Sequence, residues 1–232
     1  MRKLGVESGD TLFVHSSFKR LGPVEGGAAA VVEALECCIG AEGMILMPSF
    51  NLVEGGHAAR AANWCVETTR STVGWITEYF RTMVGTHRSD HYSHSVAARG
   101  KGAEEYVSRH KEKRGMVSPW DFEPWGRTWG CGSPMVRAYA DPQGKVLMLG
   151  VDYRTATYCH MVEVMHWNAV LQDDPEARMR GYDRERLGAY WDALGRVRRG
   201  LVGNAPSRLF QIKDFVDILL ALVEKNPTAW SR

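Results

Sequence analysis

The first part of the chain alternates between short apolar runs and a stretch with helical periodicity. Residues 11–15 (TLFVH) form an apolar run that is rich in β-forming residues and follows a Gly-Asp turn signal. Residues 28–39 place their valines, Leu35 and Ile39 on one helical face. A second apolar run, 44–47, is stopped by a proline. This order of strand, helix and strand predicts a βαβ unit and an α/β fold.

The pattern continues with further elements downstream. It predicts helices over 71–81, 103–111, about 157–169 and 214–225, and a buried strand over 145–149. Ser71 is the expected N-cap of the first of these helices. Residues 115–142 hold four prolines and three tryptophans with little periodicity, so we expect a long structured loop, a feature that is commonly functional. Since no linker or repeat interrupts the chain, residues 1–232 are expected to form one domain.

Composition narrows the class of protein. The chain is 44% hydrophobic and 24% charged with a net charge of +2, which excludes wholesale disorder and predicts no nucleic-acid partner. The longest apolar stretch, 215–223, is too short to cross a membrane and contains an aspartate. The N-terminus lacks the apolar segment of a signal peptide. Five cysteines without a CxxC pair suit a reducing compartment, so we expect a cytoplasmic protein.

The segment 157–163 (TYCHMVE) carries the residues best suited to acid–base chemistry. With Thr157 as N-cap, His160 lies in the first helical turn, where the helix dipole disfavours imidazolium and keeps the ring able to accept a proton. Glu163 shares its helical face and can hold one ring nitrogen. This spacing is more often that of a surface ion pair. A position just after a buried strand of an α/β sheet, where ligands bind, favours a catalytic pair.

A second polar segment ends the first predicted strand. The hydroxyls of Ser16 and Ser17, with free backbone N–H groups at a strand-to-helix turn, suit phosphate oxygens, although Ser-Ser also simply ends strands. No GxxxxGK[ST], GxGxxG or GxSxG motif occurs in the chain. The sequence therefore disfavours a P-loop protein, a dinucleotide-dependent dehydrogenase and a serine hydrolase.

Residues 88–95 (RSDHYSHS) form the third polar segment. Arg88 with its neighbouring hydroxyls can receive a phosphate bidentately. The histidines of this segment, and the spacing Glu163-x-x-His166, leave a metal-dependent hydrolase as an alternative. Because no HExxH motif is present, we expect no metal.

Taken in order, these segments resemble the antibiotic N-acetyltransferase (aminoglycoside 3-N-acetyltransferase-like) family along nearly the whole chain. The matching motifs are His15-Ser16-Ser17-Phe18 with Leu21-Gly22, Met47-Pro48-Ser49-Phe50, Val73-Gly74 with Thr77-Glu78 and Arg81, Arg88-Ser89-x-His91, Ser95-Val96-Ala97-Ala98, Gly132-Ser133-Pro134 with Lys145-Val146-Leu147-Met148-Leu149-Gly150, and Thr157-x-x-His160-x-x-Glu163.

The resemblance implies a three-layer α/β/α sandwich around a mixed sheet, distinct from the GNAT fold. It implies direct transfer of an acetyl group from acetyl-CoA to an amine of an aminoglycoside or related amino-sugar antibiotic, in a ternary complex. His160 would be the general base, Glu163 would orient it, and Thr157 would donate to the developing oxyanion. The residues implied to hold the cofactor are Ser16, Ser17, Phe18, Arg88, Ser89, Ser95 and Val96. Lying beside the motif strands, the candidate substrate contacts are Asn51, Asp152 and Tyr153.

Two departures from the family pattern bear on the substrate. The family often carries Asp-x-x-Thr before its TxxH core, whereas here the corresponding position is Arg154, with Asp152 two residues earlier. The pI of about 8.3 is also high for a protein that binds polycations. An acidic cleft could still come from Glu54, Asp121, Glu123, Asp152, Asp173 and Asp174. A less charged amino sugar, a non-antibiotic amine and a non-catalytic CoA-binding protein of the same fold therefore stay open. The number of subunits is also open, a homodimer included.

Overall fold

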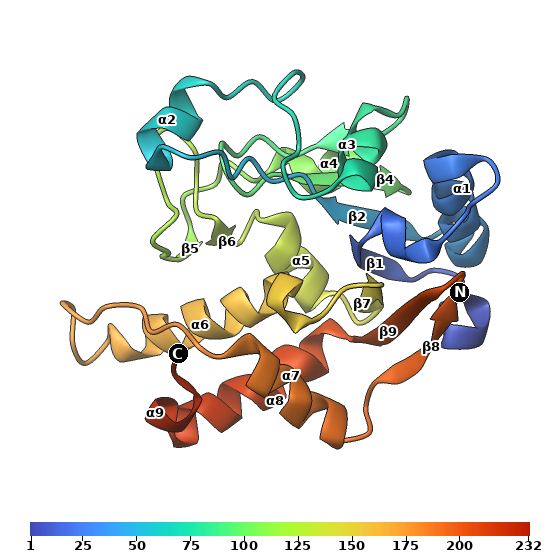
Figure 1. The fold of residues 1–232 in the computed structure, drawn as a ribbon. Coiled ribbons are helices and arrows are strands. Elements are labelled where there is room, and N and C mark those ends of the chain that lie inside the picture. The colour runs from blue at the N-terminus through green and yellow to red at the C-terminus, as the bar shows by residue number, and fades with distance from the viewer.

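The computed structural model describes residues 1–232 and is built on one mixed seven-stranded sheet (Figure 1). Its strands are β1 (Thr11–Ser16), β2 (Met44–Pro48), β3 (His87–Arg88), β4 (Val96–Gly100), β7 (Gly144–Leu149), β8 (Arg198–Val202) and β9 (Ala205–Gln211). They lie in the order β3-β4-β2-β1-β7-β9-β8. A separate two-stranded ladder joins β5 (Gly115–Met116) to β6 (Trp129–Gly130).

The helices cover both faces of this sheet. They are α1 (Gly27–Ile39), α2 (Gly56–Ala62), α3 (Trp75–Thr82), α4 (Ala103–Ser108), α5 (Pro134–Ala140), α6 (Thr157–Val170), α7 (Arg184–Ala193), α8 (Ile212–Lys225) and α9 (Pro227–Trp230). Short 3-10 turns span Arg2–Leu4, Phe18–Leu21 and Tyr153–Thr155.

Strand polarity decides where a ligand can bind. The central strand β1 runs parallel to both β2 and β7, whereas β4 and β9 pair antiparallel to the outer sides of this trio. The three parallel strands therefore end at the same edge of the sheet, at Ser16, Pro48 and Leu149. The carboxyl edge of parallel strands is the usual ligand site of α/β proteins.

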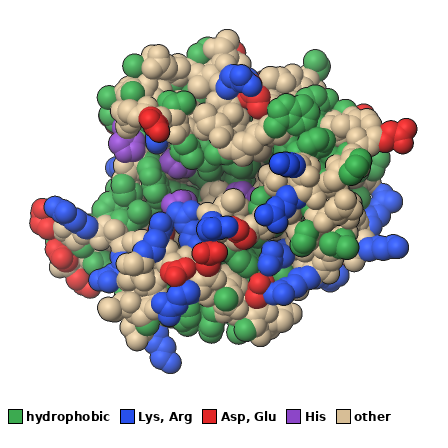
Figure 2. Space-filling model, viewed as in Figure 1, with side chains coloured by type: hydrophobic (Ala, Val, Ile, Leu, Met, Phe, Trp, Pro, Cys, Tyr) green, Lys and Arg blue, Asp and Glu red, His purple; other side chains and the backbone are tan.

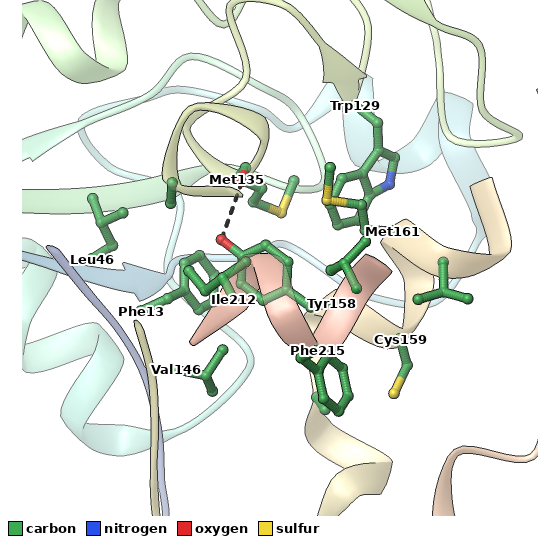
Figure 3. Packing of buried hydrophobic residues seen from close by; sticks show 14 of the residues in the cluster. Phe13, Leu46, Trp129, Met135, Val146, Tyr158, Cys159, Met161, Ile212 and Phe215 are labelled. Carbon is green, nitrogen blue, oxygen red and sulfur yellow. Dashed lines mark hydrogen bonds between the residues drawn. The ribbon is translucent and has the colours of Figure 1, made fainter. Parts of the chain in front are cut away.

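Alternation along β1 divides the interior into two cores. Leu12 and Val14 face a core shared with α1 and α3, and Phe13 faces a larger core shared with α5, α6 and α8. In Figure 3, Phe13 packs beside Tyr158, whose hydroxyl donates to the carbonyl of Met135 at 3.1 Å. Helices thus sandwich the sheet, and the predicted α/β/α three-layer architecture is confirmed.

Most predicted elements are present, with three differences. The helix expected to begin at Ser71 begins at Trp75, because Gly74 (φ 134°) turns the chain there and the Ser71 hydroxyl bonds to Thr77 at 2.8 Å instead of capping a helix. Within 115–142, the predicted loop contains the β5–β6 ladder and α5. The amphipathic pattern did not predict α7 or the β8–β9 hairpin. None of the helices has both the length and the apolar character that crossing a bilayer requires.

A close contact at Gly188 holds α7 against the rest of the molecule. A Cβ at this position would lie 2.1 Å from Cδ2 of Tyr153. We expect Gly188→Ala to lower the free energy of unfolding by about 1–3 kcal/mol through overpacking. Helix propensity alone would raise it by about 1 kcal/mol. Urea titration measures the sign, and Ala189→Gly on the exposed side of α7 isolates the propensity contribution. A stabilised Gly188→Ala protein would contradict the close contact.

Candidate active site

A cavity of about 330 Å³ opens at the carboxyl edge of the parallel strands. Its lining residues are His15, Ser16, Pro48, Phe50, Leu52, Val73, Thr77, Val151, Arg154, Thr155, Thr157, His160 and Arg184. Figure 2 shows histidine side chains in a hollow across the middle of this face, with Lys and Arg side chains gathered along its lower edge. The cavity thus combines apolar walls with a few convergent polar groups, as small-molecule sites do.

His160 and Glu163 form a hydrogen-bonded pair on the wall of this cavity. The two side chains project from adjacent turns of α6, and His160 Nδ1 lies 2.6 Å from Glu163 Oε2. The carboxylate is 1% exposed and its other oxygen accepts hydrogen bonds from the backbone N–H of Tyr182 (3.0 Å) and from Arg232 Nη2 (3.1 Å). With both oxygens engaged, Glu163 holds the imidazole in one orientation.

The imidazole of His160 also contacts the indole of Trp120. The indole of Trp120 meets the His160 ring edge-on, with ring centroids 4.9 Å apart. The predicted loop therefore reaches the site through a tryptophan that positions the histidine. Since Trp120 does not line the cavity, its contact is with His160 and not with the ligand space.

Glu163 determines the tautomer of His160. Its carboxylate can only accept, so the ring proton is on Nδ1 and is donated to Glu163 Oε2. Nη2 of Arg184 lies 2.7 Å from Nε2 and 3.2 Å from Nδ1, which places the guanidinium against the ring. Burial lowers the pKa of His160 from its ordinary value of 6.5, Glu163 opposes this and Arg184 adds to it. His160 is therefore a neutral imidazole whose Nε2 carries no proton.

Polar atoms with room for a ligand lie on the opposite wall. The hydroxyl oxygen of Ser16 is buried at the cavity without a hydrogen-bond partner. Nε2 of His15 accepts from the backbone N–H of Thr157 at 3.3 Å, which ties the start of α6 to the end of β1. Burial lowers the pKa of His15 to about 4, so this ring is neutral too. Ser16 therefore has a free hydrogen-bonding group beside the cavity.

Comparison with known proteins identifies the family. The family model for Aminoglycoside 3-N-acetyltransferase matches residues 13–224. The chain belongs to this family. Aminoglycoside N(3)-acetyltransferase III of Acinetobacter baumannii is 28% identical to it over 275 aligned positions, which cover 97% of this chain and 89% of that protein.

Solved structures share the family fold, which is distinct from the GNAT fold. AAC-IIIb in a binary complex with CoASH superposes with a TM-score of 0.76 at 24% identity, covering 97% of this chain and 93% of that one. AAC-VIa bound to sisomicin superposes with a TM-score of 0.73 at 26% identity, covering 97% of this chain and 94% of that one.

Four of the residues implied to hold the cofactor have another place in the structure. The Arg88 guanidinium donates to the Ser95 hydroxyl and to the carbonyls of Ser49, Val66 and Thr69. The side chains of Ser89, Ser95 and Val96 have no exposed surface. These residues of the acetyltransferase family motif join β2, β4 and the loop after α2. None of the four lines the cavity, and their contact with CoA stays a prediction.

Of the remaining predicted ligand contacts, some lie at the cavity and others do not. Ser16 lines the cavity, and Ser17 and Phe18 follow it on the surface. None of the three predicted substrate contacts lines the cavity. The amide of Asn51 is buried on the carbonyl of Tyr92 (3.1 Å), Asp152 pairs with Arg154 (2.7 Å), and the buried Tyr153 donates to Asp192 (2.6 Å). Their proximity to the motif strands in sequence did not place them on the ligand side.

The histidine-rich segment is part of the core. His91 accepts from two backbone N–H groups at Nδ1 and contacts the Thr128 hydroxyl at Nε2, and His110 contacts the Ser89 hydroxyl. The rings of His91 and His110 stack at 4.7 Å. No group of three or more His, Cys, Asp or Glu residues is arranged to hold a metal ion. These ring nitrogens serve packing, and the metal-dependent hydrolase has no support here.

Sequence reasoning missed two side chains of the cavity. His15 stood in a quoted motif without a role, and the motif was the available signal. Arg184 lies 24 residues after His160 in a helix that the pattern did not predict, and no local signal pointed to it.

Proposed function

We propose that this protein transfers an acetyl group from acetyl-CoA to an amine of an aminoglycoside or related amino sugar, with His160 as general base. One observation carries the proposal: the neutral His160 lines the cavity at the carboxyl edge of the sheet and donates from Nδ1 to Glu163 at 2.6 Å, which leaves Nε2 without a proton. A binding scaffold has no need of such a base. The CoASH complex of AAC-IIIb and the sisomicin complex of AAC-VIa support the choice of both substrates.

The cavity suits the donor. Acetyl-CoA supplies an activated thioester, and its pantetheine arm has both amide and apolar parts. The unpartnered hydroxyl of Ser16 can bond to an amide, while Phe50 and Val73 give an apolar wall. Ser17 and Phe18 continue this surface outward, and we retain these residues as the cofactor contacts. Transfer within one ternary complex needs donor and acceptor in the same cavity, which the base adjoins.

Each residue of the pair has a defined task. The amine nitrogen bonds to the acetyl carbon as the carbon–sulfur bond breaks. Nε2 of His160 takes the amine proton and returns it to the leaving thiolate, while Glu163 stabilises the imidazolium between these steps. Thr157 lines the cavity beside them, where its hydroxyl can donate to the acetyl oxygen as that oxygen becomes negative. One donor of this kind contributes about 3–4 kcal/mol.

Thiol release from acetyl-CoA over a panel of amines tests the function. The panel runs from the polycationic sisomicin to glucosamine, and calorimetry with CoA runs alongside. Turnover that His160→Ala abolishes supports acetyl transfer by this base. Binding of CoA without turnover of any amine would favour the non-catalytic alternative. If CoA does not bind, the proposed function fails.

The pH dependence of kcat/KM follows from the surroundings of His160. Its charged neighbours are Glu163 on α6, Arg184 on α7 and Arg232, with the neutral His94 opposite. Because the pKa of His160 is lowered from 6.5, the base form persists below that pH, and the acid limb of the profile is expected below 6.5. Removing Arg184 should move the limb to higher pH, since this cation lowers the pKa. A wild-type limb above pH 7 would contradict this environment.

A further inference from the structure

An exposed tryptophan lies beside the candidate active site. Trp75 is 58% exposed and is the one aromatic residue among the exposed large hydrophobic side chains. It is the first residue of α3, and the neighbouring Val73 and Thr77 both line the cavity. Because an exposed indole adds little to the core, its place at the edge of a small-molecule site favours contact with a ligand.

Two further aromatic side chains hold this indole in place. The ring of Tyr79, one helical turn along α3, stacks on Trp75 with centroids 5.8 Å apart and an interplanar angle of 22°. Phe18 contacts the indole from the turn after β1, with centroids 5.1 Å apart. The opposite side of α3 is anchored, since Ile76 and Phe80 are buried in the core shared with α1. The rings of Phe18, Trp75 and Tyr79 thus form a preformed aromatic platform.

The aromatic platform continues the wall of the cavity outward. Ser16 has its unpartnered hydroxyl at the cavity, and the chain runs from it through Ser17 to Phe18 of the platform. Since a cavity of about 330 Å³ must also admit the acceptor, the nucleotide end of CoA has to lie outside it. A pantetheine arm bonded to Ser16 leads that end over Phe18.

Two cations follow Phe18 in the same turn. Lys19 and Arg20 are exposed, and neither forms an ion pair. The side chain of Arg20 lies over Gly150, directly after β7, where an added Cβ would be 2.7 Å from Cβ of the arginine. The next residue, Val151, lines the cavity, so Arg20 is at its rim. Free cations beside an aromatic surface match the phosphates and the base of a nucleotide.

We propose that the aromatic platform binds the adenine of CoA, with Trp75 stacked on the base, and that Lys19 and Arg20 bind the phosphates. The inference rests on the proposed function and adds a site for the nucleotide end of the donor. Because adenine is remote from the thioester, this contact contributes affinity for the donor and leaves the transfer step unchanged.

A second copy of this chain is another occupant that an exposed indole could have. In a two-fold dimer the same patch meets itself, so the cations beside the platform would face one another. Like charges opposed across an interface disfavour that pairing. The phosphates of CoA instead carry the charge opposite to that of Lys19 and Arg20.

Truncated forms of the cofactor test the assignment of Trp75. Phosphopantetheine lacks the adenosine of CoA. We expect Trp75→Ala to raise the Kd of CoA by about tenfold in calorimetry and to leave that of phosphopantetheine unchanged. Trp75→Phe should restore most of the affinity, because it keeps a stacking face. Leu201→Ala removes an exposed side chain from β8, at the edge of the sheet, and should bind CoA as the wild type does.

The two cations are tested in the same way. The double variant Lys19→Gln, Arg20→Gln should raise the Kd of CoA by about tenfold or more, since it removes charge-assisted hydrogen bonds. Pantetheine, which has no phosphate, should bind the double variant and the wild type alike. Added salt should weaken CoA binding to the wild type more than to the double variant. An equal salt dependence in the two proteins would remove these side chains from the phosphates.

Steady-state thiol release provides an independent readout. Trp75→Ala should raise KM for acetyl-CoA by about tenfold and keep kcat within about twofold, as expected when a contact is equal in the ground state and the transition state. A lower kcat with an unchanged KM would show that Trp75 serves the transfer step or the acceptor, which contradicts the assignment. Since the side chain is exposed, the variant should fold, and its melting temperature checks this.

The remaining outcomes separate this inference from the proposed function. An equal loss of affinity for CoA and phosphopantetheine in Trp75→Ala would place Trp75 on the pantetheine arm. An unchanged Kd of CoA would remove adenine from the platform, and a change of subunit number in sedimentation would then assign the platform to a second copy. In both cases acetylation that depends on His160 leaves the proposed function standing. A wild-type protein that does not bind CoA removes both.

Discussion

His160→Ala is expected to lower kcat by about 10²–10⁴-fold, the usual contribution of a positioned general base. The alanine variant loses the imidazole that lines the cavity beside Thr157. The fold should tolerate the change, since the side chain is 22% exposed and lies at the cavity and not in the core. Steady-state thiol release with a saturating acceptor measures the loss, and calorimetry should show that CoA still binds.

His166→Ala is the matched control. This histidine lies on the same helix and contacts the Tyr182 hydroxyl at 2.8 Å, away from the cavity. The His166→Ala substitution also removes an imidazole from α6, so any general effect of losing an imidazole appears in both variants. Turnover of His160→Ala within threefold of His166→Ala would remove His160 from the role of base.

Glu163→Gln is expected to lower kcat by about 10²–10⁴-fold and to destabilise the protein as well. The carboxylate accepts three hydrogen bonds, from His160, Tyr182 and Arg232. An amide has one accepting oxygen, so its NH₂ group must face a donor on one side. If the NH₂ group faces Tyr182 and Arg232, a buried N–H is left without an acceptor, which lowers the free energy of unfolding by about 1–3 kcal/mol. Facing His160, it forces the proton from Nδ1 to Nε2, which removes the base.

The two readouts distinguish a positioning role from a structural one. Glu163→Gln should shift the acid limb of kcat/KM to lower pH, because Glu163 raises the pKa of His160. A purely structural loss would lower the melting temperature without moving the limb. Glu104→Gln, exposed on α4, removes the same charge and should change neither quantity. An unaltered kcat in Glu163→Gln would show that the ring needs no carboxylate.

The strands that carry the site could be predicted because their signals are local. The runs that became β1, β2 and β7 are apolar on both faces, as buried parallel strands are, and each is followed by a turn residue or proline. The strand β8 was missed because it is the edge strand of the sheet. All four residues from Arg198 to Leu201 are exposed, so β8 has no buried apolar run, and its pairing with β9 defines it instead.

Within the site, too, local spacing could be predicted from the sequence and long-range packing could not. His160 and Glu163 meet because three residues along one helix bring side chains to the same face, so their spacing predicted the 2.6 Å contact. Arg88 shows that a matching motif does not by itself define a ligand contact. A guanidinium suits a phosphate, but the packing of β2 against β4 surrounds this one with backbone carbonyls that accept its hydrogen bonds.

The sequence by itself determined the βαβ order and the histidine–carboxylate pair, because periodicity and helical spacing act over a few residues, and the resemblance of its motifs supplied the family and the α/β/α sandwich. Only the tertiary structure decided which polar groups reach the ligand, because burial and hydrogen bonding depend on distant segments. It turned Tyr153 and Asn51 inward, and it brought Arg184 from α7 against the ring of His160. That long-range contact helps to lower the pKa of His160.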